Sequence, residues 1–492
     1  MKYSAGALLS LFNLDRKGLC PLYRQIYNTI RSSILEGHLQ TGTRLPSSRT
    51  LASELGISRN TIVLAYEQLQ AEGFVTGGIG NGTFISAQLR NSRPGKQYFS
   101  KPDTRPHVSR RGKAMLTAYT AETPAGNPLP FVPGIPALDA FPFRLWNRAI
   151  NNAHKNITTA DMNYSCTAGY MPLRQSLASY LAVARGVICK PGQIFIVNGV
   201  QHGLDLVCRL LADPGDTVWL EDPGHLGARS VFAANQVRLR PVPVDQQGLI
   251  ITSAMRRSRN SRLAYVTPSH QSPTGVIMSL ERRLELLDWA CSRGSWIIED
   301  DYDSEFRYRG QPLAALQGLM EDAPVLYLGT FSKVFAPGLR LAYLVVPEVL
   351  IKSFSRARRT VDTHSPLPMQ VAMHAFINEG SFSTHIRRMK ALYADRQSSF
   401  LQAAERHFGD TVCLSASDSG MHLVGYLPRG DDRKLSEAAR NAGYMVPALS
   451  DYYLDKPRNK ALIFGYSCVP ADVMDTSVRK LARVLKPLLG RS

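Results

Sequence analysis

Apolar positions in the first 86 residues recur at the spacing of short helices and then of a small hairpin. One helix is predicted over residues 21–37, where Gly37 ends it. Its apolar face consists of Leu22, Ile26, Ile30 and Ile34. Residues 44–74 predict two more helices joined by a turn at Gly56. The following stretch, FVTGGIGNGTFIS, places two short apolar runs around glycines and predicts a hairpin.

The two helices within residues 44–74 have the pattern of a helix-turn-helix. Ser47 or Ser48 can cap the first helix, and Ser58 can cap the second, which starts at Arg59. Their apolar positions are Leu51, Ala52, Leu55, Ile62, Ala65, Tyr66 and Leu69. In such a unit the second helix enters the major groove of double-stranded DNA, and the hairpin adds a wing. We therefore expect a winged helix-turn-helix domain over residues 1–86.

From about residue 129 onward, short apolar runs alternate with helical patterns, and each run ends in a Gly, Pro or Asp cluster. The runs cover residues 194–197, 218–220, 263–266, 296–298 and 325–328. This alternation predicts an α/β domain over residues 129–492, with a mainly parallel sheet sandwiched by helices. We expect a large part at about 165–345 and a small C-terminal part at about 365–492. Ligands of such sheets bind at the carboxyl ends of the strands, so candidate chemistry is sought there.

Residues 87–128 lack either periodicity and predict a flexible basic linker. Its basic residues are Arg90, Arg93, Lys96, Lys101, Arg105, Arg110, Arg111 and Lys113, with Asp103 the one acid among these positions. This charge keeps a linker solvated, or lets it touch phosphate beside a DNA-binding domain. We expect the second role to make DNA affinity depend steeply on salt.

Composition changes this picture in three respects. The chain of 492 residues, 44% hydrophobic and 20% charged, is too long for one core and too apolar for a disordered chain. Its net charge of +19 favours a polyanionic partner, and the predicted helix-turn-helix indicates that this partner is DNA. No apolar stretch is long enough to span a membrane, and the N-terminal run lacks a cleavage site, so we expect a cytoplasmic protein. The seven scattered cysteines suggest neither a disulfide framework nor a zinc site, and we expect reduced, mostly buried thiols.

The segment from Arg44 to Phe74 resembles the winged helix of the GntR family, whose "LPSxRxLAxxLGxSRxTVxxAYxxLxxEG" pattern it matches almost throughout. Arginine pairs with guanine and asparagine with adenine when they stand at the start of a recognition helix. The wing departs from the family, since an arginine common near Gly78 is missing from Gly77, Gly78, Ile79 and Gly80. The resemblance implies DNA contacts by Arg44, Ser47, Arg49, Ser58, Arg59, Asn60 and Thr61. The alternatives are a helix-turn-helix used for protein contacts, and an Arg44 that only balances a helix end.

Lys333 follows a predicted strand in the stretch LYLGTFSKVFAPGLRLAY. A desolvated lysine held near other cations can form a Schiff base with pyridoxal phosphate. Thr330, Ser332 and Arg340 offer hydroxyls and a guanidinium suited to its phosphate. Gly199, Val200 and Gln201 stand where a strand opens into a helix, and their backbone amides suit the same phosphate.

Asp300 ends another predicted strand in WIIEDDYD. A buried carboxylate there needs a positive partner, and the protonated ring nitrogen of pyridoxal phosphate provides one. Tyr302, two residues on, can reach the phenolic oxygen of the ring. The alternative for Asp300 is a structural cap, and we expect Asp301 and Asp303 to be caps or to face solvent.

Together these motifs are similar to fold-type-I aminotransferases, and the fusion with a GntR winged helix resembles the MocR-type regulators. The resemblance implies a pyridoxal 5'-phosphate cofactor held by Lys333. TPSHQSPTG is similar to an aminotransferase loop that carries Asn where this chain has Ser272, and EDPGHLGAR to one that stacks an aromatic residue where this chain has His225. NYSCTAGYMPLR resembles a segment whose tyrosine, here Tyr164, reaches the phosphate across a homodimer.

Enzyme and regulator differ at the arginine that binds an amino acid's carboxylate. In the comparable stretch KALIFGYS that position is Ile463, although Arg307, Arg309 or Arg387 could supply a cation from elsewhere. The sequence therefore favours a regulator that senses pyridoxal phosphate, an amine or an amino acid. The alternatives are an active aminotransferase with a DNA-binding module, and a DNA-binding protein whose large domain only dimerises.

Overall fold

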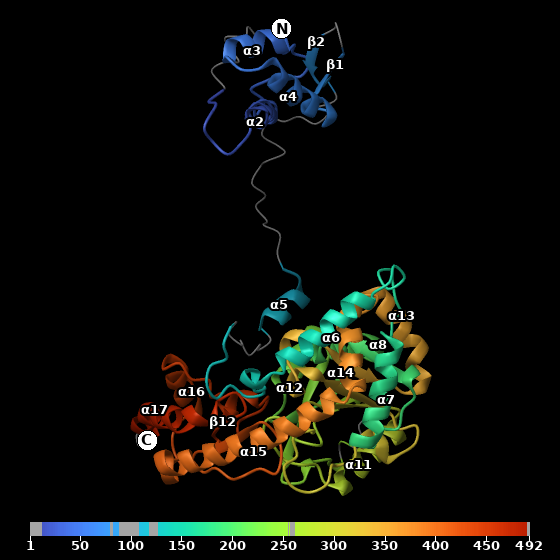
Figure 1. Cartoon of the computed structure of the whole chain (residues 1–492), viewed down its shortest axis with the longest axis vertical. Helices are drawn as coiled ribbons and strands as arrows, with labels where there is room; N and C mark the ends of the chain where they lie inside the picture. The colour runs from blue at the N-terminus through green and yellow to red at the C-terminus, as the bar shows by residue number, and fades with distance from the viewer. Residues whose placement is uncertain are drawn as a thin grey trace. The chain divides into compact units, whose positions relative to one another are not determined.

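The computed structural model describes residues 12–78, 82–87, 108–117, 126–253, 255 and 261–489. The chain divides into two compact units, residues 1–107 and 108–492, and each is described by itself. Figure 1 shows both units and labels many of their helices and the strands β1, β2 and β12.

The first unit is a small helical domain with one hairpin. Its elements are α2 (Leu22–Leu35), α3 (Ser48–Leu55), α4 (Arg59–Ala71), β1 (Val75–Gly78) and β2 (Gly82–Ile85). The predicted apolar faces meet in one core, in which Ile26, Ile30 and Leu69 are fully buried. β1 and β2 pair antiparallel, as the wing prediction requires. Its residues Ile79 and Gly80 lie outside the described residues.

Side-chain caps set the ends of the two helix-turn-helix helices. Ser47, rather than Ser48, caps α3 by accepting from the backbone N of Thr50 at 3.1 Å, and Ser58 caps α4 by accepting from the N of Asn60 at 3.3 Å. Gly56 ends α3 at φ 61°, a conformation that costs other residues more than glycine. The sharp turn between the helices therefore depends on a serine and a glycine within three residues.

One helix interrupts the segment predicted as a linker. Residues Arg110–Thr117 form α5, which belongs to the second unit and packs against α9 (Leu226–Ala234). Nε of Arg111 donates to the backbone O of Ala234 at 3.0 Å. The prediction of a flexible linker as far as residue 128 is thus wrong for these eight residues, because one arginine binds the end of a helix rather than solvent. The other basic linker positions, 90 to 105, lie outside the described residues.

The second unit is built on an eight-stranded sheet of order β3-β10-β9-β8-β7-β4-β5-β6. The strands are β3 (Ile194–Val197), β4 (Thr217–Asp222), β5 (Arg238–Asp245), β6 (Gly248–Leu249), β7 (Ser261–Val266), β8 (Trp296–Asp301), β9 (Val325–Thr330) and β10 (Ala342–Val345). β5, β4, β7, β8 and β9 run parallel, whereas β10 is antiparallel to both of its neighbours. All five predicted strands are present, and β5, β6 and β10 were missed.

Alternate side chains of each strand enter different cores. Val218 and Leu220 pack in one core with α8 (Val200–Leu211) and α9, whereas Trp219 packs on the opposite side and stacks on Trp289 of α11 (Leu280–Arg293) at 3.9 Å. The sheet is therefore covered on both faces, as its apolar runs predicted.

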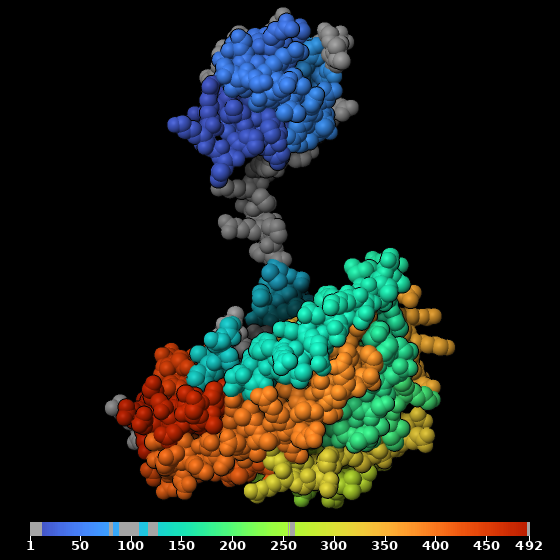
Figure 2. All heavy atoms as spheres, viewed as in Figure 1, coloured from blue at the N-terminus to red at the C-terminus, as the bar shows by residue number. Residues whose placement is uncertain are grey.

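The remaining helices and a second, two-stranded sheet complete this unit. They are α6 (Phe143–Asn156), α7 (Met171–Arg185), α12 (Phe331–Val334), α13 (Ile351–Val361), α14 (Leu367–Asn378), α15 (Ser381–Phe408), α16 (Asp432–Asn441), α17 (Ala471–Leu489), β11 (His422–Tyr426) and β12 (Ala461–Gly465). β11 and β12 pair antiparallel. Figure 2 shows α6 and the orange segments of α14 and α15 side by side on the visible face of this unit, where α6 and α14 are in contact.

The structure also bears on two expectations from the sequence, which concern the cysteines and membrane-spanning segments. All seven cysteines are free, but Cys208 alone is fully buried and four are exposed, so the expectation of mostly buried thiols is wrong. No helix in the described part of the chain is both long and apolar enough to span a membrane.

A buried ion pair joins α7 to the end of β8. Nε of Arg185 donates to Oδ2 of Asp301 at 2.6 Å, and its other nitrogens donate to the O of Leu313 and the Oγ of Ser269, each at 2.6 Å. Both side chains are about 3% exposed or less. Asp301 is therefore neither a cap nor solvent-facing, because the alternation of β8 turns it toward α7 and away from Asp300.

Replacing Arg185 should destabilise the second unit strongly. Arg185→Met leaves Asp301 as an uncompensated buried charge, so we expect a loss of about 3–5 kcal/mol in the free energy of unfolding. Chemical denaturation followed by tryptophan fluorescence measures it. Arg209→Met, which breaks a half-exposed pair with Asp205, is the control and should cost about 1 kcal/mol or less. Equal losses in the two variants would contradict this role of Arg185.

Candidate cofactor pocket and DNA-reading surface

The predicted DNA-contact residues form one exposed surface around the start of α4. Arg44, Ser47, Arg49, Ser58, Arg59 and Asn60 are exposed, and Thr61 is half-buried. Arg59 is held toward α3 by a hydrogen bond from its Nε to Oγ of Ser48 at 3.4 Å. Arg44 does not balance a helix end, because its guanidinium lies 5.8 Å from the ring centre of Phe84 in the wing. Ser47 and Ser58 use their hydroxyls as caps, which leaves the arginines and Asn60 to reach outward.

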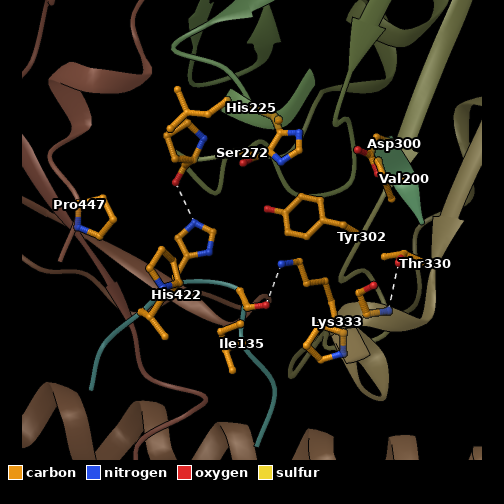
Figure 3. A pocket seen from close by; sticks show the side chains of 18 of the residues that line it. Ile135, Val200, His225, Ser272, Asp300, Tyr302, Thr330, Lys333, His422 and Pro447 are labelled. Atoms are coloured by element: carbon orange, nitrogen blue, oxygen red, sulfur yellow. Dashed lines mark hydrogen bonds between the residues drawn. The ribbon is translucent and has the colours of Figure 1, made fainter. Parts of the chain in front are cut away.

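A cavity of about 480 Å³ opens in the second unit at the carboxyl ends of the strands, and Figure 3 shows its side chains. Ten predicted cofactor residues line it: Val200, Gln201, His225, Ser272, Asp300, Tyr302, Thr330, Ser332, Lys333 and Arg340. They come from six separate stretches of chain. The predicted motifs therefore converge on one space.

Lys333 lies in the short helix α12, which begins directly after β9. Its Nζ donates to the backbone O of Gly134 at 2.8 Å (Figure 3). Burial lowers the pKa of this amine, while the carboxylates of Asp303 and Asp300 oppose that effect. Gly134 has a φ of 72°, and a Cβ there would lie 2.8 Å from Nζ, so glycine is required beside the lysine. A low pKa favours the neutral, nucleophilic amine.

Asp300, the last residue but one of β8, has one satisfied and one unsatisfied carboxylate oxygen. Oδ2 accepts from the hydroxyl of Tyr265 at 2.5 Å. Oδ1 is buried and has no hydrogen-bond partner among the described residues. Burial raises the pKa of Asp300 to about 7, although the bond from Tyr265 lowers it. The site thus holds an acceptor that lacks a donor.

Backbone and guanidinium groups gather at the start of α8. Gly199 caps α8 at φ 107°, and Nη2 of Arg340 donates to the O of Asn198 at 3.1 Å. A Cβ at Gly199 would lie 2.8 Å from that Nη2. On the facing segment, Thr330 accepts from the N of Ser332 at 3.0 Å. An anion here would meet helix amides and one arginine together.

His225 and Tyr302 flank the same space. The ring of His225 lies nearly parallel to that of Tyr265, with an interplanar angle of 19°, and its Nδ1 lies 3.2 Å from the Tyr265 hydroxyl. Burial, helped by Lys333, lowers the pKa of His225 to about 4, so its ring is neutral near pH 7. Tyr302 points its hydroxyl at Nδ1 of His270, 3.0 Å away.

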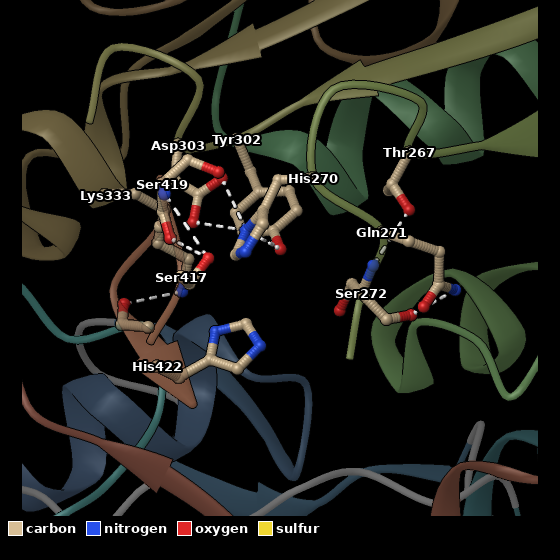
Figure 4. Close-up of polar contacts among 12 residues, drawn as sticks. Thr267, His270, Gln271, Ser272, Tyr302, Asp303, Lys333, Ser417, Ser419 and His422 are labelled. Atoms are coloured by element: carbon tan, nitrogen blue, oxygen red, sulfur yellow. Dashed lines mark hydrogen bonds and ion pairs between the residues drawn. The ribbon is translucent and has the colours of Figure 1, made fainter. Parts of the chain in front are cut away.

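A buried cluster that the sequence did not predict lies beside Tyr302 (Figure 4). Nδ1 of His270 lies 3.0 Å from Oδ2 of Asp303, and both side chains are 2% exposed or less. His422 of β11 packs beside them, with Nε2 2.8 Å from the O of Pro273. Asp303 is therefore buried, not a cap, because a histidine 33 residues away partners it. One ring nitrogen from each of His270 and His422 and one carboxylate oxygen of Asp303 all lie within 4.8 Å of one another. The spacing of these residues in the sequence does not reveal this grouping.

Tyr164 is the predicted cofactor residue that lies apart from the pocket. It is 84% exposed, and its ring contacts His364. Ile463 of β12, which stands where an aminotransferase would carry its carboxylate-binding arginine, does line the pocket. Arg307, Arg309 and Arg387 do not line it, and the last two are exposed.

The residues present fit pyridoxal phosphate. Oδ1 of Asp300 needs a donor, which a protonated ring nitrogen supplies. Lys333 presents an amine of lowered pKa for the aldehyde, and the start of α8 with Arg340 suits the phosphate.

Comparisons with known proteins agree with both units. Residues 138–476 match the model of "Aminotransferase class I and II", and residues 22–85 match "Bacterial regulatory proteins, gntR family". The chain is 37% identical over 470 residues to the "Probable rhizopine catabolism regulatory protein MocR" of Rhizobium meliloti, covering 95% of this chain and 94% of that one. The chain belongs to the MocR-type branch of the GntR family.

Further relatives show the same two-part organisation or the fold of the larger part. This MocR-type chain is 30% identical to the "HTH-type pyridoxine biosynthesis transcriptional regulator PdxR" of Corynebacterium glutamicum, over 92% of this chain and 93% of that one. Among solved structures, LysN, the alpha-aminoadipate aminotransferase of Thermus thermophilus, matches with a TM-score of 0.67 and 28% identity, covering 77% of this chain and 95% of its own. The kynurenine aminotransferase of Pyrococcus horikoshii gives a TM-score of 0.67 at 25% identity, covering 80% and 98%. The fold-type-I aminotransferase prediction is confirmed.

Removing the buried charge of Asp300 should stabilise the cofactor-free protein in a pH-dependent way. The pKa of Asp300 is about 7 in the folded chain, above its ordinary value of 3.8, so its burial costs stability increasingly as pH rises between these values. The free energy of unfolding of Asp300→Asn, relative to that of wild type, should therefore rise by roughly 2–3 kcal/mol between pH 5 and pH 8. Denaturation of the cofactor-free proteins at both pH values measures the difference.

The exposed Asp288→Asn on α11 is the control for loss of a negative charge, and its difference from wild type should not change with pH in this way. Added pyridoxal phosphate should reverse the order, stabilising wild type more than Asp300→Asn. A pH-independent gain for Asp300→Asn would show that the carboxyl is not forced to ionise in a dry site.

Proposed function

We propose that this chain is a DNA-binding transcriptional regulator whose aminotransferase-like domain binds pyridoxal phosphate through Lys333 and responds to that cofactor or to an amine. The observation that carries the proposal is the convergence of Lys333, Asp300 and Arg340 on one cavity in a chain that also has an exposed recognition helix. The names of its relatives support it, since one is a rhizopine catabolism regulatory protein and another a pyridoxine biosynthesis regulator.

Recognition of double-stranded DNA is assigned to α4 and the turn before it. Arg59 and Asn60 begin the helix, and their exposed side chains suit guanine and adenine edges in the major groove. Arg44 and Arg49 flank them and suit phosphate, which positions the helix without reading sequence.

We propose a homodimer as the working form. Tyr164 does not line its own pocket and is largely exposed, as expected for a side chain that completes the phosphate site of a second copy. A twofold dimer would present two recognition helices, which suits an operator with two half-sites.

In the pocket, bound pyridoxal phosphate supplies an aldehyde that captures a primary amine covalently. Lys333 would hold the cofactor through Nζ, Asp300 would hold its ring nitrogen, and Arg340 with the amides of Val200 and Gln201 would hold its phosphate. His225, neutral because burial keeps its pKa near 4, would cover the ring. Tyr302, which is backed by His270 and Asp303, would offer its hydroxyl to the ring oxygen.

Helix α9 connects this pocket to α5, the first helix of the second unit. His225 caps its N-terminus, and Leu226, Gly227 and Ser230 line the cavity. At its other end the O of Ala234 accepts from Arg111 of α5, the first helix after residue 107. A cofactor that shifts α9 would therefore shift α5, provided that it favours one arrangement over another.

The second candidate is an active aminotransferase. The Lys333–Asp300–Tyr302 set favours it, because the same groups serve transamination in enzymes of this fold. Ile463 counts against it, since an aliphatic side chain cannot bind the carboxylate of an amino acid. Multiple turnovers of an amino acid with a keto acid would favour the enzyme.

Reciprocal variants test the proposed function. Lys333→Ala should lose the visible absorbance of protein-bound pyridoxal phosphate and any effect of the cofactor on DNA binding. Arg59→Ala should keep that absorbance but bind operator about tenfold or more weakly. The operator is first selected from random duplexes with the wild-type protein, and affinities are measured by fluorescence anisotropy.

Arg144→Ala, which removes an exposed charge from α6, is the control and should change neither property. Wild-type protein without cofactor absorbance, or Arg59→Ala with undiminished DNA affinity, would contradict the proposal.

Breaking the contact between α5 and α9 should uncouple the two activities. Arg111→Ala loses the bond to Ala234, so cofactor absorbance and basal DNA affinity should stay close to wild type while the ligand-dependent change in affinity falls. The same anisotropy titration, with and without pyridoxal phosphate, measures the change. Arg110→Ala, its exposed neighbour, is the matched control and should respond like wild type. An unaltered response in Arg111→Ala would rule out this route.

A further inference from the structure

The part of the cavity that residues 422–463 line is where the body of a ligand would lie once its amine reaches Lys333. Its wall includes His422 of β11, Met445, Pro447, Tyr452 and Ile463 of β12. Figure 3 shows His422 and Pro447 on the opposite side of the space from Asp300. Ile463 is 1% exposed and packs with Leu449 and Tyr453, which keep it in place.

This part of the cavity lacks a positive charge in the described part of the chain. Lys333 and Arg340 are the lysine and arginine among the described lining residues, and both are assigned to the cofactor. Burial lowers the pKa of His422 to about 4, as it does for His225, so neither ring is cationic near pH 7. Asp300 is the carboxylic acid among the described lining residues, and it is assigned to the ring nitrogen of the cofactor.

The polar groups near the ligand are neutral. Nε2 of His422 lies 2.8 Å from the O of Pro273, a distance at which a neutral ring donates from Nε2 and keeps Nδ1 as an acceptor. Ser272 and Tyr302 contribute hydroxyls. An acceptor nitrogen and hydroxyls suit a donor such as an alcohol, whereas a carboxylate buried here would lose its hydration without a counter-charge.

We propose that the effector of this pocket is a primary amine without a carboxylate, whose remaining part is apolar or carries neutral hydroxyls. The inference rests on the proposed function, because the amine is captured at the cofactor held by Lys333. Ile463 is the residue that sets this specificity, by occupying the wall where a cation would bind a carboxylate.

The capture step is a balanced exchange. The ligand's nitrogen forms a C=N bond to the aldehyde carbon of the cofactor as the C=N bond to Nζ of Lys333 breaks. The two protons that the ligand's amine loses end on Nζ, which leaves as a free amine. No electrons are transferred, so the step needs no oxidant or acceptor.

Matched pairs of ligands that differ by a carboxylate test the proposal. The probes are ethanolamine and serine, tyramine and tyrosine, and propylamine and 4-aminobutyrate. Each is titrated into the full-length, pyridoxal-phosphate-bearing protein, and the shift of the visible absorbance band is followed. In at least one pair, we expect the amine to give half of the full absorbance shift at a concentration about tenfold or more lower than its carboxylated partner.

An amino acid that binds as tightly as its matched amine would overturn the inference and leave the regulator standing. A cofactor band that no probe shifts would also overturn it, since no external amine is then captured. Absence of the cofactor band itself would overturn the proposed function, so the two failures are distinguishable.

Ile463→Arg should narrow or reverse the preference by raising the affinity for the carboxylated partner about tenfold or more. Ile463→Met keeps an apolar side chain of similar size and should preserve it. Both variants are first checked for the wild-type cofactor band, which reports a folded pocket. If Ile463→Arg lacks the band, the matched pairs on wild type decide. An unaltered preference in a band-bearing Ile463→Arg would overturn the assignment to Ile463.

Discussion

The constraint on which this pocket depends is a carboxylate buried with half of its hydrogen-bonding capacity unused. Tyr265 satisfies one oxygen of Asp300, and the other faces the cavity without a donor. Such an arrangement is costly in a dry site unless something positive arrives. Around this carboxylate, Lys333 has a lowered pKa, His225 is neutral, and Arg340 lines the same cavity. A hydrogen-bond donor for this oxygen would therefore lower the free energy of the folded state.

The residues that the sequence could predict share a simple property, since each follows a strand or starts a helix. Lys333, Asp300 and Gly199 stand at the carboxyl ends of strands, where the sheet brings them together, and Ser58 and Arg59 stand at a helix start with a recognisable cap. The missed residues need knowledge of distant partners. Asp303 and His270 are 33 residues apart on different loops, and Arg185 of α7 pairs with Asp301 over 116 residues. No local pattern reports such pairs. β10 was missed because it follows the lysine loop, and α5 because its composition is that of a linker.

Neutrality recurs in the larger unit. Burial removes the charge of His225 and His422 near pH 7. The buried carboxylates of Asp303 and Asp301 are paired with His270 and Arg185, respectively. The charges left in the cavity are those a phosphate, a ring nitrogen and an aldehyde require. The DNA-reading surface has the opposite character, with exposed arginines around a helix start. One chain thus combines an exposed surface whose charges salt can screen and a buried cavity whose charges are screened much less.

Residues 132–135 form one wall of the cavity and include Gly134, whose carbonyl accepts from Lys333. Just before them, Phe131 bridges to Gly465 of β12, and the O of Pro130 accepts from the N of Met445. The chain therefore crosses its own ligand site before it enters the sheet. Anyone excising the larger domain for crystallography or ligand screening has to begin upstream of this crossing. A truncation that starts at α6 would retain the sheet but would remove one wall of the cavity.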